Sequence, residues 1–206
     1  MSEYGKLLYY KVEIVMKNLE QYIQKHGKVI DGKVLKVDTF LNHQVDPNLM
    51  QEIGEAFYDY FKKYPITKVV TIETSGIAPA LMCALKFNVP MIFIKKAIPS
   101  TMEEAYVAEV FSFTKNKKYT ICLSKHLLQE EDHILFIDDF LANGQAFLAV
   151  EQLVEEAKAK IDGVGIVIDK VFQNGHKMIL DRGYDLYSLA CIKELNEEGV
   201  FFDETL

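Results

Sequence analysis

The amino-acid sequence predicts an α/β fold in which helices cover both faces of a central parallel sheet. Two observations support this prediction. Apolar runs rich in β-branched residues, such as TKVVTIE (67–73), alternate with segments whose apolar residues recur at helical spacing. Three of these runs also end in unusual polar or small residues, in ETSG, IDDFLANGQA and IDK. Ligands of parallel sheets bind beyond the carboxyl ends of the strands, so the convergence predicts a site there.

In the first half of the chain, capping residues mark where helices begin and end. Gly27 ends the first amphipathic helix, and Asp46 and Pro47 supply an N-cap and a first-turn proline for the second. The elements expected here are a helix over residues 5–26, a short strand over 34–40, a helix from 46 to about 63, a strand over 67–73, a helix that follows the turn TSGIAPA (74–80) and runs to about 87, and a strand over 90–96.

The second half begins with a segment that has no helical period. Within it, EVFSFTKNKKYTICLS (109–124) alternates like a hairpin around Asn116 and Lys117. The elements expected after it are a strand over 133–139, a helix over 144–160, a strand over 162–170, a helix near 174–182 and a last strand near 185–192.

Composition narrows the classes of function. The chain has 206 residues, of which 50% are apolar, so we expect a single domain over residues 1–206 with a full core. The net charge of −7 argues against a general surface for nucleic acid or anionic membranes. Three distant cysteines form neither a disulfide framework nor a metal site, and they indicate a reducing cytoplasm. We expect no membrane span and no signal peptide, because apolar runs are short and the N-terminus is charged.

The most informative segment is ILFIDDFLANGQA (134–146), an apolar strand that leads into two aspartates and a glycine turn. Asn143 and Gly144 can adopt positive φ, and small residues let the backbone approach a ligand. The loop enters a helix N-terminus, where free N–H groups and the helix dipole favour a phosphate. Asp138 and Asp139 can accept hydrogen bonds from the vicinal hydroxyls of a ribose. Together these features indicate a ribose 5-phosphate, although two carboxylates at a strand end also fit an ordinary acidic loop.

The same segment resembles the phosphoribosyl-diphosphate signature of the type I phosphoribosyltransferases, in the form found in bacterial xanthine phosphoribosyltransferases. The resemblance runs from about residue 30 to the C-terminus and is carried also by LKVDTFLNHQVDP (35–47), ITKVVTIETSGIAPA (66–80), VFSFTK (110–115) and GIVIDKVFQ (165–173). It implies a central parallel sheet, a small hood formed mainly by residues 30–47 and a C-terminal part, and a flexible hairpin lid at about 97–124.

The resemblance further implies a role for each strand end. Asp138 and Asp139 would be catalytic, binding the ribose hydroxyls and favouring the positive charge that the sugar gains as its C1–O bond breaks. Lys170 would donate to the 6-oxo group of a purine. The diphosphate substrate would be bound by Ser75, Gly76, Lys96, Ala142, Asn143, Gly144, Gln145 and Ala146, and xanthine by Leu35, Asn42 and Lys170. Mg²⁺ would arrive with the diphosphate, held mainly by substrate oxygens and water and by no protein ligand.

Simpler interpretations remain open for some of these residues. The SGIAP run is also an ordinary helix start, and lysines such as Lys96 and Lys170 are common at exposed strand ends. Phe40 and Phe172 can each stack on the base or belong to the core. The chain also departs from the family after residue 96, where AIPSTMEEA is acidic instead of basic, and at QNGHKM (173–178), which is less basic than usual.

The predicted function is transfer of ribose 5-phosphate from 5-phospho-α-D-ribose 1-diphosphate to N9 of xanthine, which gives xanthosine monophosphate and pyrophosphate. One alternative is a hypoxanthine/guanine phosphoribosyltransferase, which differs at the 2-position of the base. Another is a non-catalytic purine regulator that senses the diphosphate, but residues 1–33 supply no basic DNA-binding domain. A phospho-acceptor signalling domain does not fit, because its acidic pair follows the first strand. The family further implies a cytoplasmic homodimer.

Overall fold

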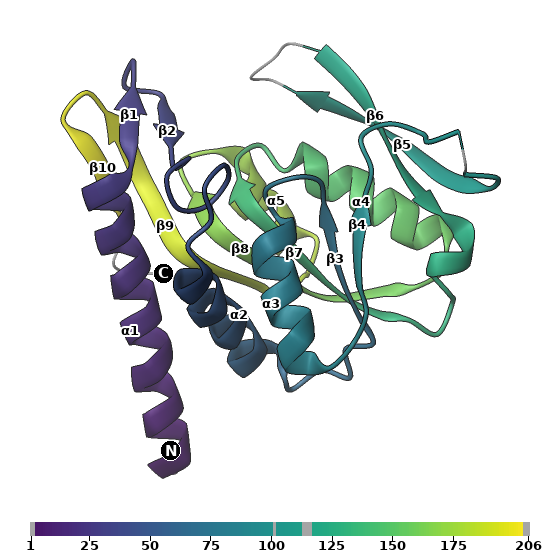
Figure 1. The fold of residues 1–206 in the computed structure, drawn as a ribbon, viewed down its shortest axis with the longest axis horizontal. Coiled ribbons are helices and arrows are strands. Elements are labelled where there is room, and N and C mark those ends of the chain that lie inside the picture. Colours follow the sequence, from purple (N-terminus) through teal and green to yellow (C-terminus); the bar gives the residue numbers. More distant parts are fainter. Residues whose placement is uncertain (1–2, 101, 113–116, 204–206) are drawn as a thin grey trace.

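Six strands form the central sheet, in the spatial order β10-β9-β8-β7-β3-β4 (Figure 1). Their bounds are β3 Lys68–Ile72, β4 Met91–Ile94, β7 His133–Leu141, β8 Lys160–Lys170, β9 Leu186–Asn196 and β10 Gly199–Phe202. Neighbouring strands pair in parallel from β4 to β9, and β10 at one edge is antiparallel. The computed structural model describes residues 3–100, 102–112 and 117–203, and it confirms the predicted α/β class.

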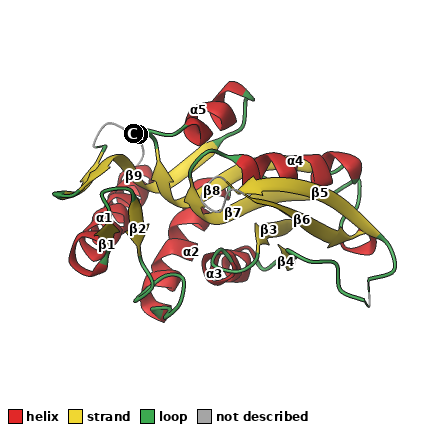
Figure 2. Cartoon of the chain, turned by 90° about the horizontal axis from the view of Figure 1, so that it is seen from above, coloured by secondary structure: helices red, strands yellow, loops and turns green. Residues whose placement is uncertain are grey.

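Helices cover both faces of this sheet (Figure 2). Their bounds are α1 Glu3–His26, α2 Pro47–Phe61, α3 Ile77–Phe87, α4 Gln145–Glu156 and α5 Asn174–Asp181. One apolar cluster joins α1, α2 and α3 to the sheet, and a second joins α4 to the opposite face. Two glycines of β8 let α2 pack directly on the strand, because a Cβ would lie 2.4 Å from the ring of Phe61 at Gly163 and 2.9 Å from that of Phe57 at Gly165.

The helices expected from the sequence are all present, and the predicted cap of α2 is confirmed. The side chain of Asp46 accepts hydrogen bonds from the backbone N–H groups of Asn48 at 2.9 Å and Leu49 at 3.1 Å, and Pro47 is the first helical residue. No helix in the described part of the chain is long and apolar enough to span a membrane.

The strand expected over residues 34–40 is shorter than predicted. It ends at Lys36 as β2 (Val34–Lys36), because the N–H of Leu41 bonds back to the carbonyl of Val37 at 3.1 Å and turns the chain away. Its partner β1 (Lys28–Ile30) was not expected, and the two form a small antiparallel sheet. This hairpin stands beside β10, at the same edge of the molecule as the upper end of α1 (Figure 1).

The helix expected over residues 144–160 was also predicted too long. α4 ends at Glu156, after which Lys158 adopts a left-handed conformation with φ 60°. The chain then enters β8 at Lys160, which pairs with His133 of β7. Pairing in the sheet therefore overrides the helical propensity of the AKAK run. The strand β7 in turn extends two residues past the aspartates, to Leu141.

The predicted hairpin is confirmed and starts four residues earlier than expected. Strands β5 (Ala105–Ser112) and β6 (Lys117–Ser124) pair antiparallel, and a short 3-10 turn over Lys125–Leu127 follows them. The residues between the strands, 113–116, which include part of the VFSFTK motif and Asn116 of the expected turn, lie outside the described residues. Ala108, Val110, Ile121 and Leu123 are buried against the α4 side of the sheet.

Candidate functional site

Three strand ends meet at one edge of the sheet. Because β3, β7 and β8 are parallel neighbours, the segments at their carboxyl ends, ETSG, DDFLANGQA and DK, converge at the edge of the sheet that lies uppermost in Figure 1. The convergence expected from the sequence is thus present. The geometry of each segment decides what it can bind.

Asp138 and Asp139 form a half-buried acidic pair near the end of β7. The N–H of Asp139 donates to Oδ1 of Asp138 at 3.0 Å. Burial from water raises the pKa of Asp138 well above the usual carboxyl value, and the negative charge of Asp139 raises it further. Burial also raises the pKa of Asp139, whereas the positive charge of Lys96 lowers the pKa of both. Hydroxyl donors or a cation would stabilise this concentration of negative charge.

The turn after β3 lies directly against the acidic pair. A Cβ at Gly76 would be only 3.0 Å from Oδ1 of Asp138 and 2.1 Å from Oγ1 of Thr71, so only glycine fits there. Gly76 also precedes α3, so the run is a helix start as well as part of the site. Ser75 stands next to it in the same turn, and its hydroxyl can donate to an anion beside Asp138.

Lys96 is held near the same place by the end of β4. Its backbone N–H donates to the Glu73 carboxylate at 2.6 Å, which ties the ends of β4 and β3 together. Its Nζ lies 5.6 Å from the centroid of the Tyr119 ring. Since its charge also lowers the pKa of both aspartates, Lys96 is positioned to balance an anion at this edge.

The loop after β7 is shaped for close contact with a ligand. Gly144 has φ 75° and caps the N-terminus of α4, as its sequence position predicted, whereas Asn143 has no positive φ. A Cβ at Gly144 would lie 2.2 Å from Cε of Met178 and 3.2 Å from Cα of Gly175. The N–H of Gly175 donates to the carbonyl of Ala142 at 2.9 Å. The first residues of α5 therefore support this loop, which sequence reasoning did not foresee.

A pocket of about 150 Å³ lies between Asp138 of the acidic pair and this loop. It is lined by Asp138 and Phe140 of β7, by residues 142–147, and by Val110, Phe111 and Tyr119 of the hairpin. Burial raises the pKa of Tyr119, and the charge of Asp138 raises it further, as expected for a phenol close to the carboxylate. Tyr119 was not expected from the sequence, because the alternation of a hairpin does not reveal which of its faces meets a site 19 residues later in the chain.

Lys170 lies on the other side of Phe140. Its Nζ is 5.7 Å from the centroid of the Phe140 ring, and burial lowers the pKa of its ammonium group. It is thus a partly desolvated cation, not the fully solvated lysine of a simple strand end. Lys170 itself does not line the pocket that holds Asp138. Phe140 lines that pocket and also lies beside Lys170.

The remaining predicted residues belong to the hood. Leu35 is 6% exposed and packs into the apolar cluster, so its side chain is not available to a ligand. Asn42 has an exposed side chain in the turn after β2. Phe40 is buried with its ring edge-on to Tyr22, which makes it a core residue, whereas Phe172 is 48% exposed just beyond β8. Neither Leu35 nor Asn42 lines the pocket beside Asp138.

The acidic residues of the 97–106 loop lie at the base of the hairpin. Lys125 donates its backbone N–H to the carbonyl of Glu104 at 3.1 Å, and its Nζ lies 3.8 Å from the Glu104 carboxylate. Glu103 lines a surface hollow beside them. Part of the negative charge that departs from the family pattern is therefore balanced locally.

The acidic pair also bears on metal binding. Among the described residues, no group of three or more His, Cys, Asp or Glu side chains is arranged to hold a metal ion. Asp138 and Asp139 offer the carboxylate oxygens that Mg²⁺ prefers, but two residues cannot complete its coordination. A magnesium ion at this edge would need most of its oxygens from a bound ligand and from water.

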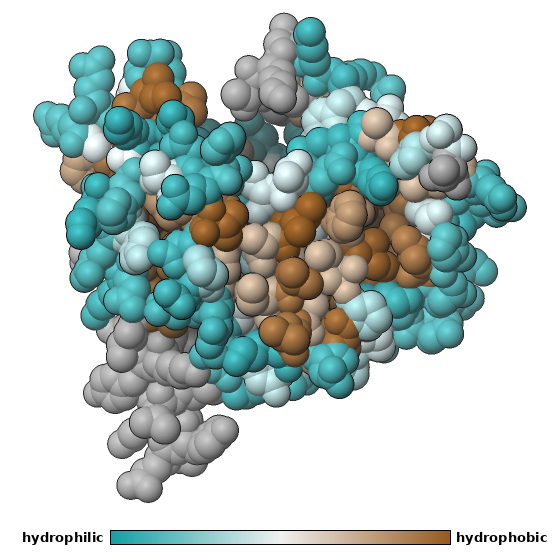
Figure 3. Space-filling model, in the orientation of Figure 1, coloured by the Kyte–Doolittle hydropathy of each residue, from teal (hydrophilic) through white to brown (hydrophobic). Residues whose placement is uncertain are grey.

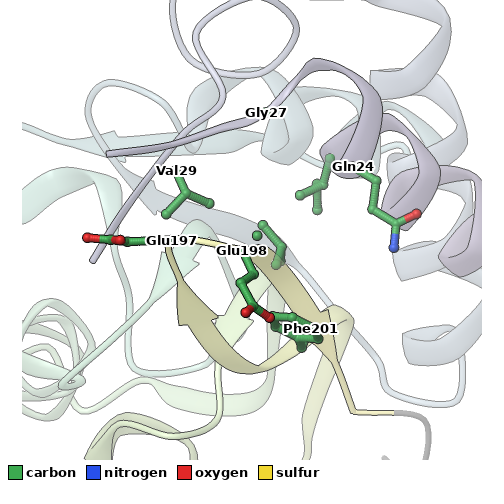
Figure 4. A pocket seen from close by; sticks show the side chains of 9 residues that line it. Gln24, Gly27, Val29, Glu197, Glu198 and Phe201 are labelled. Atoms are coloured by element: carbon green, nitrogen blue, oxygen red, sulfur yellow. The ribbon is translucent and has the colours of Figure 1, made fainter. Parts of the chain in front are cut away.

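A larger hollow of about 390 Å³ lies away from this edge, between the end of α1, β1 and the turn from β9 to β10 (Figure 4). Its charged residues are Glu197 and Glu198, next to apolar side chains such as Val29 and Phe201. Two carboxylates repel phosphates, so this hollow does not suit the ligand indicated by the strand ends.

Comparison with known proteins shows which family shares these features. The family model described as "Phosphoribosyl transferase domain" matches residues 36–200. The chain is 53% identical to the xanthine phosphoribosyltransferase of Macrococcus caseolyticus over 90% of this chain and 96% of the relative. It is 53% identical to xanthine phosphoribosyltransferase 1 of Clostridium botulinum over 91% of this chain and 99% of the relative. It is 51% identical to the xanthine phosphoribosyltransferase of Staphylococcus aureus over 90% and 97%.

Solved structures share the same fold. The adenine phosphoribosyltransferase of Trypanosoma brucei superposes with a TM-score of 0.71 at 20% identity, covering 88% of this chain and 82% of that one. That of Giardia lamblia superposes with a TM-score of 0.70 at 20% identity, covering 84% and 97%. At this level of identity the likeness establishes the architecture alone.

Proposed function

The chain belongs to the phosphoribosyltransferase family, and from this premise we propose how its strand ends carry out the reaction. The protein is an enzyme of purine salvage. It transfers ribose 5-phosphate from 5-phospho-α-D-ribose 1-diphosphate to N9 of xanthine, which releases pyrophosphate and gives xanthosine monophosphate. The choice of xanthine rests on the three relatives at 51–53% identity, each matched over 90% or more of both chains.

One observation carries the assignment of the site. Gly76 lies against Oδ1 of Asp138, so the turn proposed for the diphosphate is in contact with the carboxylates proposed for the ribose. The phosphate loop 142–146 lines the same pocket as Asp138. A ribose with a phosphate at its 5-position and a diphosphate at its 1-position needs these three partners around one ring.

In this proposal Asp138 and Asp139 accept hydrogen bonds from the 2- and 3-hydroxyls. As the C1–O bond breaks, the sugar gains positive charge, and the half-buried carboxylates stabilise that charge. Ser75, Gly76 and Lys96 hold the departing pyrophosphate. The backbone N–H groups of residues 142–146 and the N-terminus of α4 hold the 5-phosphate, and Gln145 adds a side-chain donor.

The base would bind on the Lys170 side of Phe140. The Lys170 ammonium can only donate, so it suits a 6-oxo group and disfavours the 6-amino group of adenine. Asn42 of the hood would donate to the 2-oxo group, and Leu35 would contribute backbone contacts. Phe172 is the better candidate for stacking on the purine, because Phe40 is buried.

Mg²⁺ would enter with the diphosphate. It would neutralise the leaving group and relieve the repulsion between Asp138 and Asp139, with substrate oxygens and water completing its shell. The hairpin β5–β6 would serve as a lid over the reacting sugar, since three of its residues line the pocket.

The proposal also covers assembly and compartment. We expect a homodimer, supported by the exposed apolar side chains of Leu81 and Leu85 on α3 and Phe93 on β4. We place the reaction in the cytoplasm, because Cys83, Cys122 and Cys191 are free and buried, as is common in a reducing compartment.

The test is direct. The purified protein is incubated with phosphoribosyl diphosphate, Mg²⁺ and, separately, xanthine, guanine, hypoxanthine or adenine, and the nucleotide and pyrophosphate are identified by chromatography. We expect xanthosine monophosphate as the favoured product. A preference for guanine or hypoxanthine would replace the proposed base, and the absence of any nucleotide would overturn the reaction.

A further inference from the structure

A buried carboxylate lies directly before the base-recognition lysine. Asp169 is 0% exposed at the end of β8, and its Oδ2 accepts from Oγ of Ser188 at 2.8 Å and from Nδ1 of His176 at 2.6 Å. The other carboxylate oxygen, Oδ1, is buried and has no hydrogen-bond partner among the described residues. Both donors therefore bond the same oxygen of this buried carboxylate, one from β9 and one from α5.

The helix that carries His176 also presses on the phosphate loop. The residue before it, Gly175, donates its N–H to the carbonyl of Ala142 at 2.9 Å, and a Cβ at Gly175 would lie 2.7 Å from Leu141 and 2.9 Å from the backbone nitrogen of Gly144. The position of α5 therefore decides where the loop sits. The N-cap residue of α5, Gln173, also donates its N–H to the carbonyl of Lys170 at 2.8 Å.

Together, the two sets of contacts link Lys170 to the phosphate loop through α5. Lys170 follows Asp169 on β8, Asp169 is bonded to His176 on α5, and α5 supports residues 142–144. A purine nucleotide has a nearly fixed separation between its base and its 5-phosphate. A site that binds both ends must hold its base subsite and its phosphate subsite at that separation.

We propose that Asp169 and His176 are a positioning pair that fixes the distance between Lys170 and the 5-phosphate loop. This inference rests on the proposed function, because it assumes that Lys170 meets the base and that residues 142–146 meet the phosphate. The pair touches neither the base nor the phosphate. It acts by holding α5 against β8, through a hydrogen bond from an imidazole N–H to a buried carboxylate, which is stiff and costly to break.

The experiment compares two ligands in the same variants. Xanthosine monophosphate spans both subsites, whereas ribose 5-phosphate reaches the loop but not Lys170. Affinities are measured by titration calorimetry for wild-type protein and for His176→Asn, His176→Gln and His176→Leu. The amide nitrogen of Asn replaces Nδ1, the atom that bonds Asp169, whereas that of Gln replaces Nε2 and misses the carboxylate. Lys177→Ala is the matched control, since Lys177 is the next residue of α5 and its side chain is 80% exposed.

If one subsite is misplaced, the affinity for xanthosine monophosphate, which reaches both subsites, should fall more than the affinity for ribose 5-phosphate. We expect His176→Gln and His176→Leu to bind xanthosine monophosphate about tenfold or more weaker and ribose 5-phosphate no more than about threefold weaker, because misplacement by about 1 Å can cost up to 100-fold. His176→Asn and Lys177→Ala should bind both ligands as the wild type does. Because the Asn and Gln variants differ by one methylene, this comparison decides the matter even where His176→Leu does not fold.

Two results would overturn the positioning pair: an equal loss for both ligands in His176→Gln, or unchanged affinity for xanthosine monophosphate in that variant. Loss in His176→Asn as large as in His176→Gln would also overturn it, since rescue by the Nδ1 mimic is its central claim. Failure of the proposed function is separate. It would appear as wild-type protein that does not bind xanthosine monophosphate at all.

Discussion

Asp138 and Asp139 carry an electrostatic cost in the folded protein. Burial from water, and then the charge of Asp139, raises the pKa of Asp138 well above the ordinary carboxyl value, and burial raises that of Asp139. The folded state therefore binds protons more tightly than the unfolded chain. Below about pH 4 the carboxyls are protonated in both states and the pair has no cost, whereas stability is lost as pH rises through the folded pKa values.

Replacing both aspartates by asparagine should therefore lower activity and raise stability together. We expect Asp138→Asn/Asp139→Asn to lose about 100- to 1000-fold in kcat, because a charge that stabilises the transition state is removed. Its Tm should rise at pH 7 and approach that of the wild type near pH 4. Initial rates and thermal melts at both pH values measure this. Asp181→Asn, at an exposed position on α5, is the control. Near-normal turnover in the double variant would remove the pair from the mechanism.

Ala142 leads to a second prediction, about the proton of the incoming base. Hypoxanthine/guanine enzymes of this family commonly carry an aspartate here, third after the acidic pair, near N7 of the purine. An alanine cannot accept the proton that the base must lose, and a placed proton acceptor typically contributes about 10²–10⁴-fold. Xanthine ionises near neutral pH far more readily than hypoxanthine, so an enzyme that uses the anion needs no such group.

We expect kcat/KM for xanthine to rise with pH along the ionisation of free xanthine. It should fall again when Lys170 loses its proton, and burial lowers the pKa of Lys170, so this fall should begin below the usual lysine value of about 10.4. Hypoxanthine should be a poor substrate, and Ala142→Asp should narrow the gap. Rate profiles from pH 6 to pH 10 for both bases give the answer. Equal rates for the two bases at neutral pH would contradict the anion mechanism.

At the residue scale, the sequence predicts site residues most readily where they are contiguous. Asp138, Asp139 and Gly144 stand within seven residues, so their chemistry can be read from one segment. Tyr119 and His176 were missed because they reach the site through the hairpin and through α5, and neither contact follows from local pattern. Phe40 illustrates the opposite case, since an aromatic residue in a recognised motif is part of the core.

At the scale of elements, one part of the hairpin β5–β6 packs into the core, and another part lines the pocket. Ala108 and Ile121 are buried against α4, so the part of the hairpin nearest the sheet belongs to the core. Further along, Phe111 and Tyr119 line the pocket together with Val110, which is itself buried. A mobile lid over the whole of 97–124 does not fit this packing. Movement is expected in the outer part alone.

Hydrogen exchange should resolve this division. When phosphoribosyl diphosphate and an inert base analogue bind together, we expect amides of residues 109–112 and 117–120 to exchange more slowly. Amides of residues 105–108 and 121–124 should change little, because they are already protected by the core. Helix α2, which lies on the opposite face, is the internal control. Equal exchange across the hairpin in free and bound protein would exclude a lid.

The strands that sequence reasoning missed are short and form hairpins with the strand next to them in the chain. Strands β1 and β10 are three and four residues long, and the first pairs across a turn while the second depends on β9. Segments this short give no reliable period. The end of α4 was placed too late because Lys160 leaves the helical pattern to pair with His133.

At the scale of the whole molecule, the order of the strands creates the site. The sequence predicted a parallel sheet but not its order, because order depends on contacts such as Val69 with Leu135, 66 residues apart. β3 lies between β4 and β7, so the ETSG turn meets the acidic pair on one side and Lys96 on the other. β8 lies on the far side of β7, which brings Lys170 to the same edge.

The same architecture leaves one apolar face on the outside. Leu81 and Leu85 are 49% and 71% exposed, one turn apart on α3, and Phe93 of the edge strand β4 is 41% exposed. Figure 3 shows apolar side chains gathered across the middle of the molecule, with hydrophilic residues around them. A helix stripe of this kind can pair with its own copy about a two-fold axis, as the homodimer expected from the family requires.

Leu85→Glu should separate the two subunits without disturbing either. Because Leu85 is largely exposed in the single chain, a carboxylate there costs the monomer little. In a two-fold dimer the substitution occurs twice and places both charges at one apolar contact. We expect the wild type to sediment as a dimer and Leu85→Glu as a monomer, with the dimer weakened about 100-fold or more, the effect of roughly 3 kcal/mol.

Leu180→Glu on α5, at a position 48% exposed and away from this face, should remain dimeric. Sedimentation velocity at micromolar concentration measures all three proteins. A monomeric wild type would contradict the homodimer, whereas an unchanged dimer in Leu85→Glu would place its interface elsewhere.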